Sequence, residues 1–389
     1  MTTSVDSPAE TVLGRSWKVP TILGVVTLLA LVLFVVRKGS GTSTFALASE
    51  DDFFALPAVG VPSYGAGLVV VVLLAVITGY AALLASRYRS TPLWLLAVFA
   101  VLFVFGFLAW AADGETIPVP GLLIGAVALS TPLIFGAMGG VISERVGVIN
   151  IAIEGQLLAG AFVSAVVASI TGSTYVALLA ALVAGALTAS LLAVFSIRYF
   201  VNQVIVGVVL NVLVVGLTSF LYSVVLTKNA ETLNSPPRFA RIDIPVLSQI
   251  PILGPVLFRQ TLIVYLMYIA VALVFFGLFH TKWGLRLRAV GEHPQAADTV
   301  GINVARTRFW NVCLAGAIAG LGGAYFTLGS VGAFGKEMTA GAGYIALAAV
   351  IFGRWDPVRA PWPHCCSASR RICRTYWASS GPRCRASSC

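Results

Sequence analysis

Charged residues are scarce in this chain. Only 10% of its 389 residues are charged, whereas 58% are hydrophobic. A soluble domain carries roughly 25% charged residues. The charges gather in short islands between apolar runs, and a run of about 18 or more apolar residues is long enough to span a bilayer. The sequence therefore excludes a soluble multidomain protein and predicts an all-α, polytopic membrane protein.

Motifs for nucleotide, metal and catalytic chemistry are also missing. No Gly-x-x-x-x-Gly-Lys-Ser/Thr loop is present, so the chain does not bind ATP in that way. Residues 341–346 match a dinucleotide-binding pattern loosely, but they lie in an apolar run with no strand before them. His280 and His293 have no metal-site spacing around them. No nucleophile, base and orienting group occur as a set. We expect no enzyme activity, no cofactor and no metal site.

The formal net charge is +10, which raises the question of nucleic-acid binding. Lys and Arg at the ends of apolar runs are typical of the cytoplasmic loops of membrane proteins. Because the basic residues lie there and in the last 30 residues, we expect no nucleic-acid partner.

Apolar runs predict about ten transmembrane or re-entrant helices. Spaced glycine pairs, which let helices approach closely in lipid, occur at Gly121/Gly125, Gly136/Gly140 and Gly316/Gly320. The last run is short enough to be re-entrant. The runs lie at 19–36, 66–85, 92–111, 121–142, 147–170, 174–197, 203–226, 261–280, 309–329 and 340–353.

Orientation follows from the basic residues. The loop 281–308 carries five Lys or Arg residues against Glu292 and Asp298, and is therefore expected in the cytoplasm. Counting spans back from it places the N-terminal tail, residues 1–18, in the cytoplasm and the proline-rich loop 227–260 outside. A cleaved signal peptide is a weaker interpretation, because the Ala-x-Ala sequence at 46–48 lies far beyond the first apolar run. The protein is expected in the plasma membrane.

One polar group stands out inside an apolar run. Glu154 lies about two turns into the fifth run, and an intramembrane carboxylate is a functional candidate by default. Asn150 lies four residues earlier on the same face, and Gly147 and Gly155 favour an interrupted helix. Three interpretations stay open: a hydrogen-bonded clasp between helices, a lining of the translocation path, and proton coupling. Gln156 belongs to the same segment.

The seventh run adds two amides on one helical face, since Gln203 and Asn211 are eight residues apart. They either bridge helices or line the path. The loop 284–303 contains a second notable pattern. Pro294 suits the first turn of a short helix and Gly301 suits its end, which predicts a rigid cytoplasmic lever; a passive polar loop is the alternative.

Four segments together resemble the permeases of nucleoside-type ABC importers, within the wider sugar and branched-chain amino-acid permease family. These segments are Glu144 to Gln156, Asn202–Gln203, Gly284 to Asn303 and Gly341 to Pro357. The resemblance extends over about residues 131–359. It implies an ATP-binding subunit, a second homologous permease and an extracytoplasmic substrate-binding lipoprotein as partners, beside membrane lipid.

The polar residues of the fifth and seventh runs give the expected translocation path: Asn150, Glu154, Gln156, Gln203 and Asn211. The resemblance also implies that the segment around Glu292 to Gly301 contacts the ATP-binding subunit. The expected contact with the ATPase contains Arg288, Gly291, Glu292, Pro294, Ala296, Ala297 and Gly301. The chain then divides into a tail (1–18), less diagnostic spans (19–120), a permease core (121–359) and a final segment (360–389).

The predicted function is the transmembrane path for nucleosides or related small polar solutes. Two alternatives remain: an ABC permease for simple sugars or branched-chain amino acids, and a proton-coupled secondary transporter using Glu154.

The final segment differs from the rest of the chain. Residues 361–389 hold five of the six cysteines and five arginines, and the apolar pattern stops. The Cys and His spacings at 364–366 fit no standard zinc site. Read in the neighbouring frame, permissive codons give an apolar span that resembles the family's sequence there. We therefore predict an out-of-frame tail that replaces the final spans.

Overall fold

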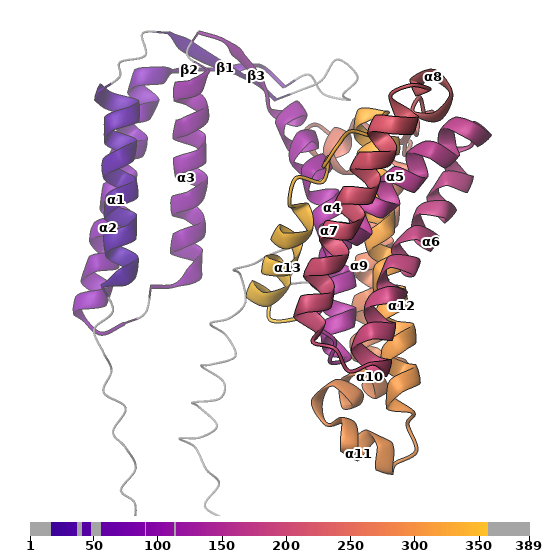
Figure 1. Ribbon diagram of the computed structural model, residues 1–389. Coiled ribbons are helices and arrows are strands. Elements are labelled where there is room, and N and C mark those ends of the chain that lie inside the picture. Colours follow the sequence, from indigo (N-terminus) through magenta and orange to yellow (C-terminus); the bar gives the residue numbers. More distant parts are fainter. Residues whose placement is uncertain (1–16, 37–40, 48–55, 90, 113, 357–389) are drawn as a thin grey trace, which may run out of the picture. The chain divides into compact units, whose positions relative to one another are not determined.

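The computed structural model describes residues 17–36, 41–47, 56–89, 91–112 and 114–356 (Figure 1). The predicted tails, residues 1–18 and 360–389, lie outside this part except for Trp17 and Lys18. The described chain forms two compact units, up to residue 119 and from residue 120 onward. Nine described helices are long and apolar enough to cross a membrane, and one shorter apolar helix follows them. The prediction of an all-α polytopic membrane protein is confirmed.

The first unit packs three helices beside a small sheet. Its helices are α1 (Lys18–Leu31), extended by a π-helical turn to Val36, α2 (Ser63–Ser86) and α3 (Leu93–Ala111). Phe34 is buried and fits against Gly106, where an added Cβ would lie 2.9 Å from the ring. The strands β1 (Thr42–Ala46), β2 (Val59–Pro62) and β3 (Thr116–Pro118) form the order β2-β1-β3, with β1 antiparallel to β2 and parallel to β3. The sequence pattern did not predict these strands.

The second unit contains the longer helices. The spans are α4 (Val119–Arg145), α5 (Ile153–Thr171), α6 (Thr174–Ala193), α7 (Gln203–Leu221), α9 (Leu262–His280) and α12 (Val304–Ala324). π-helical turns extend α6 to Arg198, α7 to Leu226 and α12 to Val331. The shorter elements are α8 (Ala230–Leu233), β4 (Arg241–Asp243), β5 (Arg259–Thr261), α10 (Lys282–Glu292), α11 (Pro294–Thr299) and α13 (Ala342–Phe352).

Glycines bring α12 against both α5 and α6. An added Cβ at Gly316 or Gly320 would overlap atoms of α6, and one at Gly323 would overlap the Leu157 carbonyl of α5. Small residues allow such close backbone contact in lipid, where van der Waals packing stabilises helix association. The predicted close packing at Gly316/Gly320 is confirmed.

The other two glycine pairs differ from each other. A Cβ at Gly136 would lie 3.0 Å from Ala346 of α13, and one at Gly140 would lie 3.0 Å from Val350. This pair therefore receives α13. At Gly125, no described atom lies within 4 Å of an added Cβ, and Gly121 is exposed. The expectation of close packing at Gly121/Gly125 is not met among the described residues.

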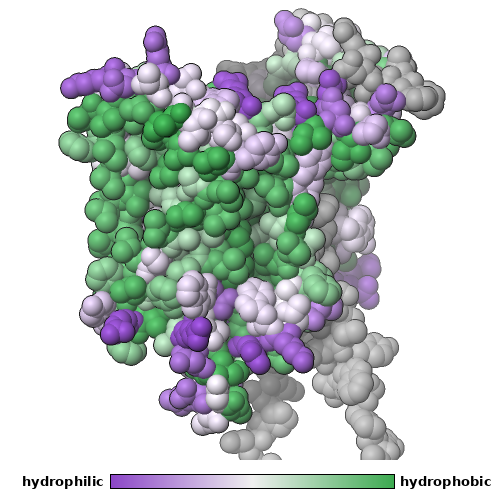
Figure 2. All heavy atoms as spheres, turned by 90° about the vertical axis from the view of Figure 1, so that its right-hand side faces the viewer, coloured by the Kyte–Doolittle hydropathy of each residue, from purple (hydrophilic) through white to green (hydrophobic). Residues whose placement is uncertain are grey.

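The connections of the second unit gather at two ends. Gly291, at the end of α10, lies against the Arg145 carbonyl at the end of α4. The turn between α6 and α7 shares a cleft with α11. At the opposite end of α5, the Ser235 amide donates to Ser169 Oγ. The loops predicted as cytoplasmic and external therefore separate as the alternation of spans requires. Figure 2 shows the side of the molecule that lies to the right in Figure 1. A broad hydrophobic band covers this side, with hydrophilic residues above and below it.

Candidate functional site

The site begins where α4 ends and α5 starts. Gly147 adopts φ +85°, a left-handed conformation that favours glycine, and its amide donates to the Glu144 carbonyl at 3.0 Å. The chain then turns back and enters α5 at Ile153, which contacts Gly136 and Gly140 of α4. These glycines precede Arg145 by nine and five residues, so α5 starts about 8–14 Å inward from the end of α4. The chain turns at Gly147, so the fifth helix starts at 153 rather than 147, whereas Gly155 lies inside α5 and does not interrupt it.

Glu154 binds the start of α13. The residue is buried, with 6% of its surface exposed. Oε1 accepts hydrogen bonds from Thr339 Oγ1 at 2.6 Å and the Gly341 amide at 2.9 Å, and Oε2 accepts one from the Gly343 amide at 2.6 Å. A buried carboxylate is tolerated when donors satisfy it, and the free amides at a helix N-terminus favour negative charge. Glu154 therefore joins α5 to α13 across 185 positions of sequence.

Asn150 and Gln156 form a closed pair beside it. Each amide nitrogen donates to the other side chain's amide oxygen at 3.1 Å, and both residues are fully buried. This pair ties the turn 148–152 to the first turn of α5. Because both side chains are occupied by each other, the pair stabilises the interruption between the helices.

Two side chains of α7 bind the same turn. Asn211 Oδ1 accepts from the Gly155 amide at 2.8 Å, and its Nδ2 donates to the Ile151 carbonyl at 2.9 Å and to the Tyr344 hydroxyl at 3.1 Å. Gln203 Oε1 accepts from the Ile149 amide at 2.7 Å. The structure thus brings all five predicted path residues to one connection, which we call the polar cluster: Asn150, Glu154, Gln156, Gln203 and Asn211.

Sequence reasoning missed the partners that lie just before α13 and in its first turn. Thr339, Gly341 and Gly343 supply donors to Glu154, and Tyr344 accepts from Asn211. A usable signal existed, since two glycines at the start of an apolar run leave backbone N–H groups accessible to a buried acceptor. The Tyr344 ring remains 48% exposed.

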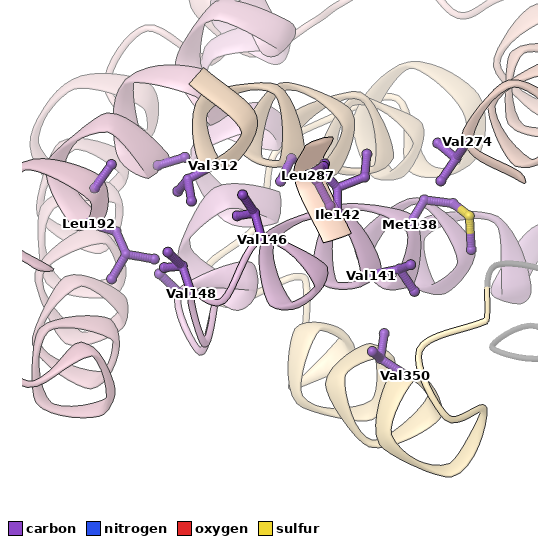
Figure 3. Packing of buried hydrophobic residues seen from close by; sticks show 14 of the residues in the cluster. Met138, Val141, Ile142, Val146, Val148, Leu192, Val274, Leu287, Val312 and Val350 are labelled. Carbon is purple, nitrogen blue, oxygen red and sulfur yellow. The ribbon is translucent and has the colours of Figure 1, made fainter. Parts of the chain in front are cut away.

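The predicted lever lies at the end of α4. Helices α10 and α11 follow each other directly, and Gly301 has φ +85° beyond the end of α11. The predicted short helix from Pro294 is therefore confirmed. Leu287 and Val290 of α10 are fully buried in a cluster with Ile142 of α4 and with Val146, which directly follows α4 (Figure 3). Val350 of α13 faces the same cluster beside Val141.

The seven predicted coupling residues divide by exposure. Glu292, Ala296 and Gly301 are exposed, whereas Ala297 is 3% exposed and packs in the same cluster as Leu287. Gly291 is held against Arg145. The remaining two, Arg288 and Pro294, are partly buried. Fewer residues are therefore available to a partner than were predicted, because Ala297 faces inward.

Hydrogen bonds from α12 and from the segment after α13 hold the end of α4 and the turn that leads into the polar cluster. Arg308 Nε donates to the Val146 carbonyl at 3.3 Å. Arg145 Nε donates to the Trp355 carbonyl at 3.0 Å, and Trp355 Nε1 donates to Glu144. A cleft of about 880 Å³ beside the lever is lined by Gln203, Asp298 and Arg308, among others. The lever itself meets this region through Gly291, which lies against the Arg145 carbonyl.

In the part of the chain that the structure describes, no group of three His, Cys, Asp or Glu side chains is placed to hold a metal ion.

A family model described as "Branched-chain amino acid transport system / permease component" matches residues 122–363. The chain belongs to this permease family. The permease is 41% identical over 238 residues to a nucleoside ABC transporter permease protein of Lactococcus lactis, covering 59% of this chain and 74% of the relative. It is 40% identical over 254 residues to a guanosine ABC transporter permease protein of Bacillus subtilis, covering 63% and 77%.

A third relative of the permease, provisionally named as a glucose ABC transporter permease of Haloferax volcanii, is 36% identical over 243 residues, covering 61% of this chain and 72% of the relative. No solved structure matches the chain. The resemblance to permeases of nucleoside-type ABC importers is confirmed. These relatives are permease components of transporters, and the apolar helices agree with a multi-pass membrane protein.

Proposed function

We propose that this permease forms the membrane path of an ABC importer for nucleosides. The observation that carries the proposal is the match, at about 40% identity over most of their length, to two relatives named for nucleoside and guanosine transport. We further propose that an ATP-binding subunit docks on the lever, that a second, similar permease completes the path, and that a binding lipoprotein delivers the substrate. The N-terminus then lies in the cytoplasm, with the lever on the same side.

The contacts suggest how ATP-driven movement reaches the path. A partner pressing on the exposed face of α11 would shift α10, which packs on the end of α4. Arg308 would carry the movement to the Val146 carbonyl. The turn 148–152 is bound to α7 through Gln203 and Asn211, and α5 is bound to α13 through Glu154. The polar cluster would then move α7 and α13 together.

Two alternative functions differ from this proposal in the substrate or in the energy source of transport. A simple-sugar permease is favoured by the glucose-named relative, and a proton-coupled transporter would use Glu154. The three donors around the Glu154 carboxylate support a clasp between helices instead of a proton carrier, since both oxygens are already occupied.

Uptake measurements distinguish these functions. Cells carrying the permease with the ATP-binding subunit, second permease and binding protein of its own transport system should take up labelled guanosine. Uptake should cease when cellular ATP is depleted and should persist with a protonophore if ATP is maintained. Uptake of glucose or leucine in place of guanosine would refute the nucleoside assignment. Loss of uptake with the protonophore alone would refute ATP coupling.

A further inference from the structure

A small basic pocket lies where α10 meets the start of α12. Its volume is about 340 Å³. Arg286 of α10 and Arg306 of α12 both line it, and both are exposed. No acidic side chain lines the pocket. Among the described residues, neither guanidinium forms an ion pair or a side-chain hydrogen bond. Two uncompensated positive groups therefore face one cavity.

Two tryptophans form the walls of this pocket. Trp283 stands one residue after the start of α10, and its ring lies against Gly277 of α9, where an added Cβ would be 3.0 Å from it. Trp310 of α12 is 62% exposed. Tryptophan gathers at the level of lipid headgroups because its ring is apolar and its N–H is polar. The pocket thus has the composition of a membrane–water boundary.

The apolar side of the pocket continues along a spanning helix. Leu314 follows Trp310 by one turn of α12 and is 44% exposed. Both α9 and α12 are apolar enough to cross a membrane, and the pocket lies at the end of one and the start of the other. A ligand with an anionic head and an apolar tail would place the head between the arginines and the tail against Trp310 and Leu314.

We propose that this pocket binds the headgroup of an anionic phospholipid. Arginine pairs with phosphate through two parallel hydrogen bonds, and basic pockets between helix ends select anionic lipid headgroups. The lipid phosphate would bridge α10 and α12, the two helices that flank α11. Bound lipid would thereby hold the lever against the membrane span.

The test is a lipid competition on the full chain purified in neutral detergent. Native mass spectrometry would compare retention of phosphatidylglycerol and phosphatidylcholine. We expect phosphatidylglycerol to be preferred. Loss of each arginine should weaken phosphatidylglycerol binding about fivefold. The double variant R286Q/R306Q should therefore lose most of its preference for phosphatidylglycerol over phosphatidylcholine. R198Q is the matched control, because Arg198 is an exposed basic residue at the same end of the unit but outside the pocket.

Several outcomes would overturn the proposal. Equal retention of the two lipids would mean that headgroup charge is not recognised. Equal losses in R198Q and R286Q/R306Q would indicate general surface attraction. Displacement of phosphatidylglycerol by millimolar inorganic phosphate would identify a free-anion site. Loss of lipid only when the ATP-binding subunit is added would mark the pocket as a protein contact.

A second measurement decides the question if the double variant does not fold. Phosphatidylglycerol brominated near the glycerol should quench the tryptophan fluorescence of the unaltered chain more than brominated phosphatidylcholine. W310F should remove much of that difference. Equal quenching by both lipids in the unaltered chain would refute the site.

Discussion

At the scale of single residues, Glu154 gives the sharpest prediction. Replacing it with Gln keeps the shape but leaves one acceptor oxygen and places an N–H₂ group where backbone amides donate. At least one donor at Thr339, Gly341 or Gly343 then loses its acceptor. An unsatisfied buried group costs about 1–3 kcal/mol. We expect Glu154→Gln to lower the thermal stability of the detergent-purified protein.

Thr339→Val is the matched variant, because it removes one donor and keeps both backbone amides. Its cost should be about 1 kcal/mol, so its melting temperature should fall between those of the parent and Glu154→Gln. If Glu154→Gln melts like the parent yet abolishes uptake, the carboxylate acts in the path or in proton transfer, and the clasp is not its main role.

The polar cluster shows which single residues of the site could be predicted from the sequence and which could not. All five residues were found because an amide or carboxylate in an apolar run needs a partner. The partners themselves were harder to identify. Glu154 is satisfied mostly by the backbone amides of Gly341 and Gly343, which are 187 and 189 positions away. Nearly every residue has a backbone N–H group, so these two glycines were the available signal, and the sequence analysis did not use it.

At the scale of helices, the crossing of α12 on α6 depends on glycine. At Gly320, an added side chain would overlap the Ala181 carbonyl and approach Gly185 Cα to 3.1 Å. Backbone cannot yield as a flexible side chain does, so Gly320→Val should destabilise by about 3 kcal/mol or more. Gly125→Val is the control, since an added Cβ there meets no described atom within 4 Å. Thermal unfolding and monodispersity should separate the two variants; equal behaviour would show that α12 adjusts freely.

The lever offers a second pair of variants, at adjacent positions. Ala296 is exposed and Ala297 is 3% exposed. Ala296→Arg should reduce co-purification of the ATP-binding subunit severalfold while leaving the melting temperature unchanged, because a bulky charge in a fitted interface is poorly tolerated. Ala297→Arg should instead lower the melting temperature, because it places a charge in the cluster with Leu287. Undiminished co-purification of Ala296→Arg would remove α11 from the docking surface.

Helix positions were predictable because each apolar run ends in charge, glycine or proline. The start of α5 was predicted too early. Residues 147–152 are as apolar as the spanning helix that follows them, but the chain turns at Gly147. The short strands β1 to β5 contain three to five residues each. Segments that short carry no clear alternation, so no periodic signal distinguished them from loops.

At the scale of the whole molecule, the out-of-frame tail remains a prediction. The family match ends at residue 363, close to the change in composition, and the tail lies outside the described residues. The exposed apolar side chains Ile345, Ile351 and Phe352 of α13 suit packing against further helices. Resequencing should find an apolar frame after codon 360, and the restored chain should purify with a narrower size distribution. A gene whose neighbouring frames are polar there would end the proposal.

The Glu154 clasp also has a consequence for synthesis of the protein, because Glu154 is made well before its hydrogen-bond donors. Thr339 lies 185 positions after Glu154, which at about 5–20 residues per second corresponds to about 10–40 s of translation. For most of that interval the carboxylate lies outside the ribosome while its donors have not yet been synthesised. Until α13 is made, the Glu154 carboxylate must be hydrated or shielded by the insertion machinery. Ribosomes stalled before codon 339 should therefore leave α5 exchangeable with water, and release past codon 343 should lock it.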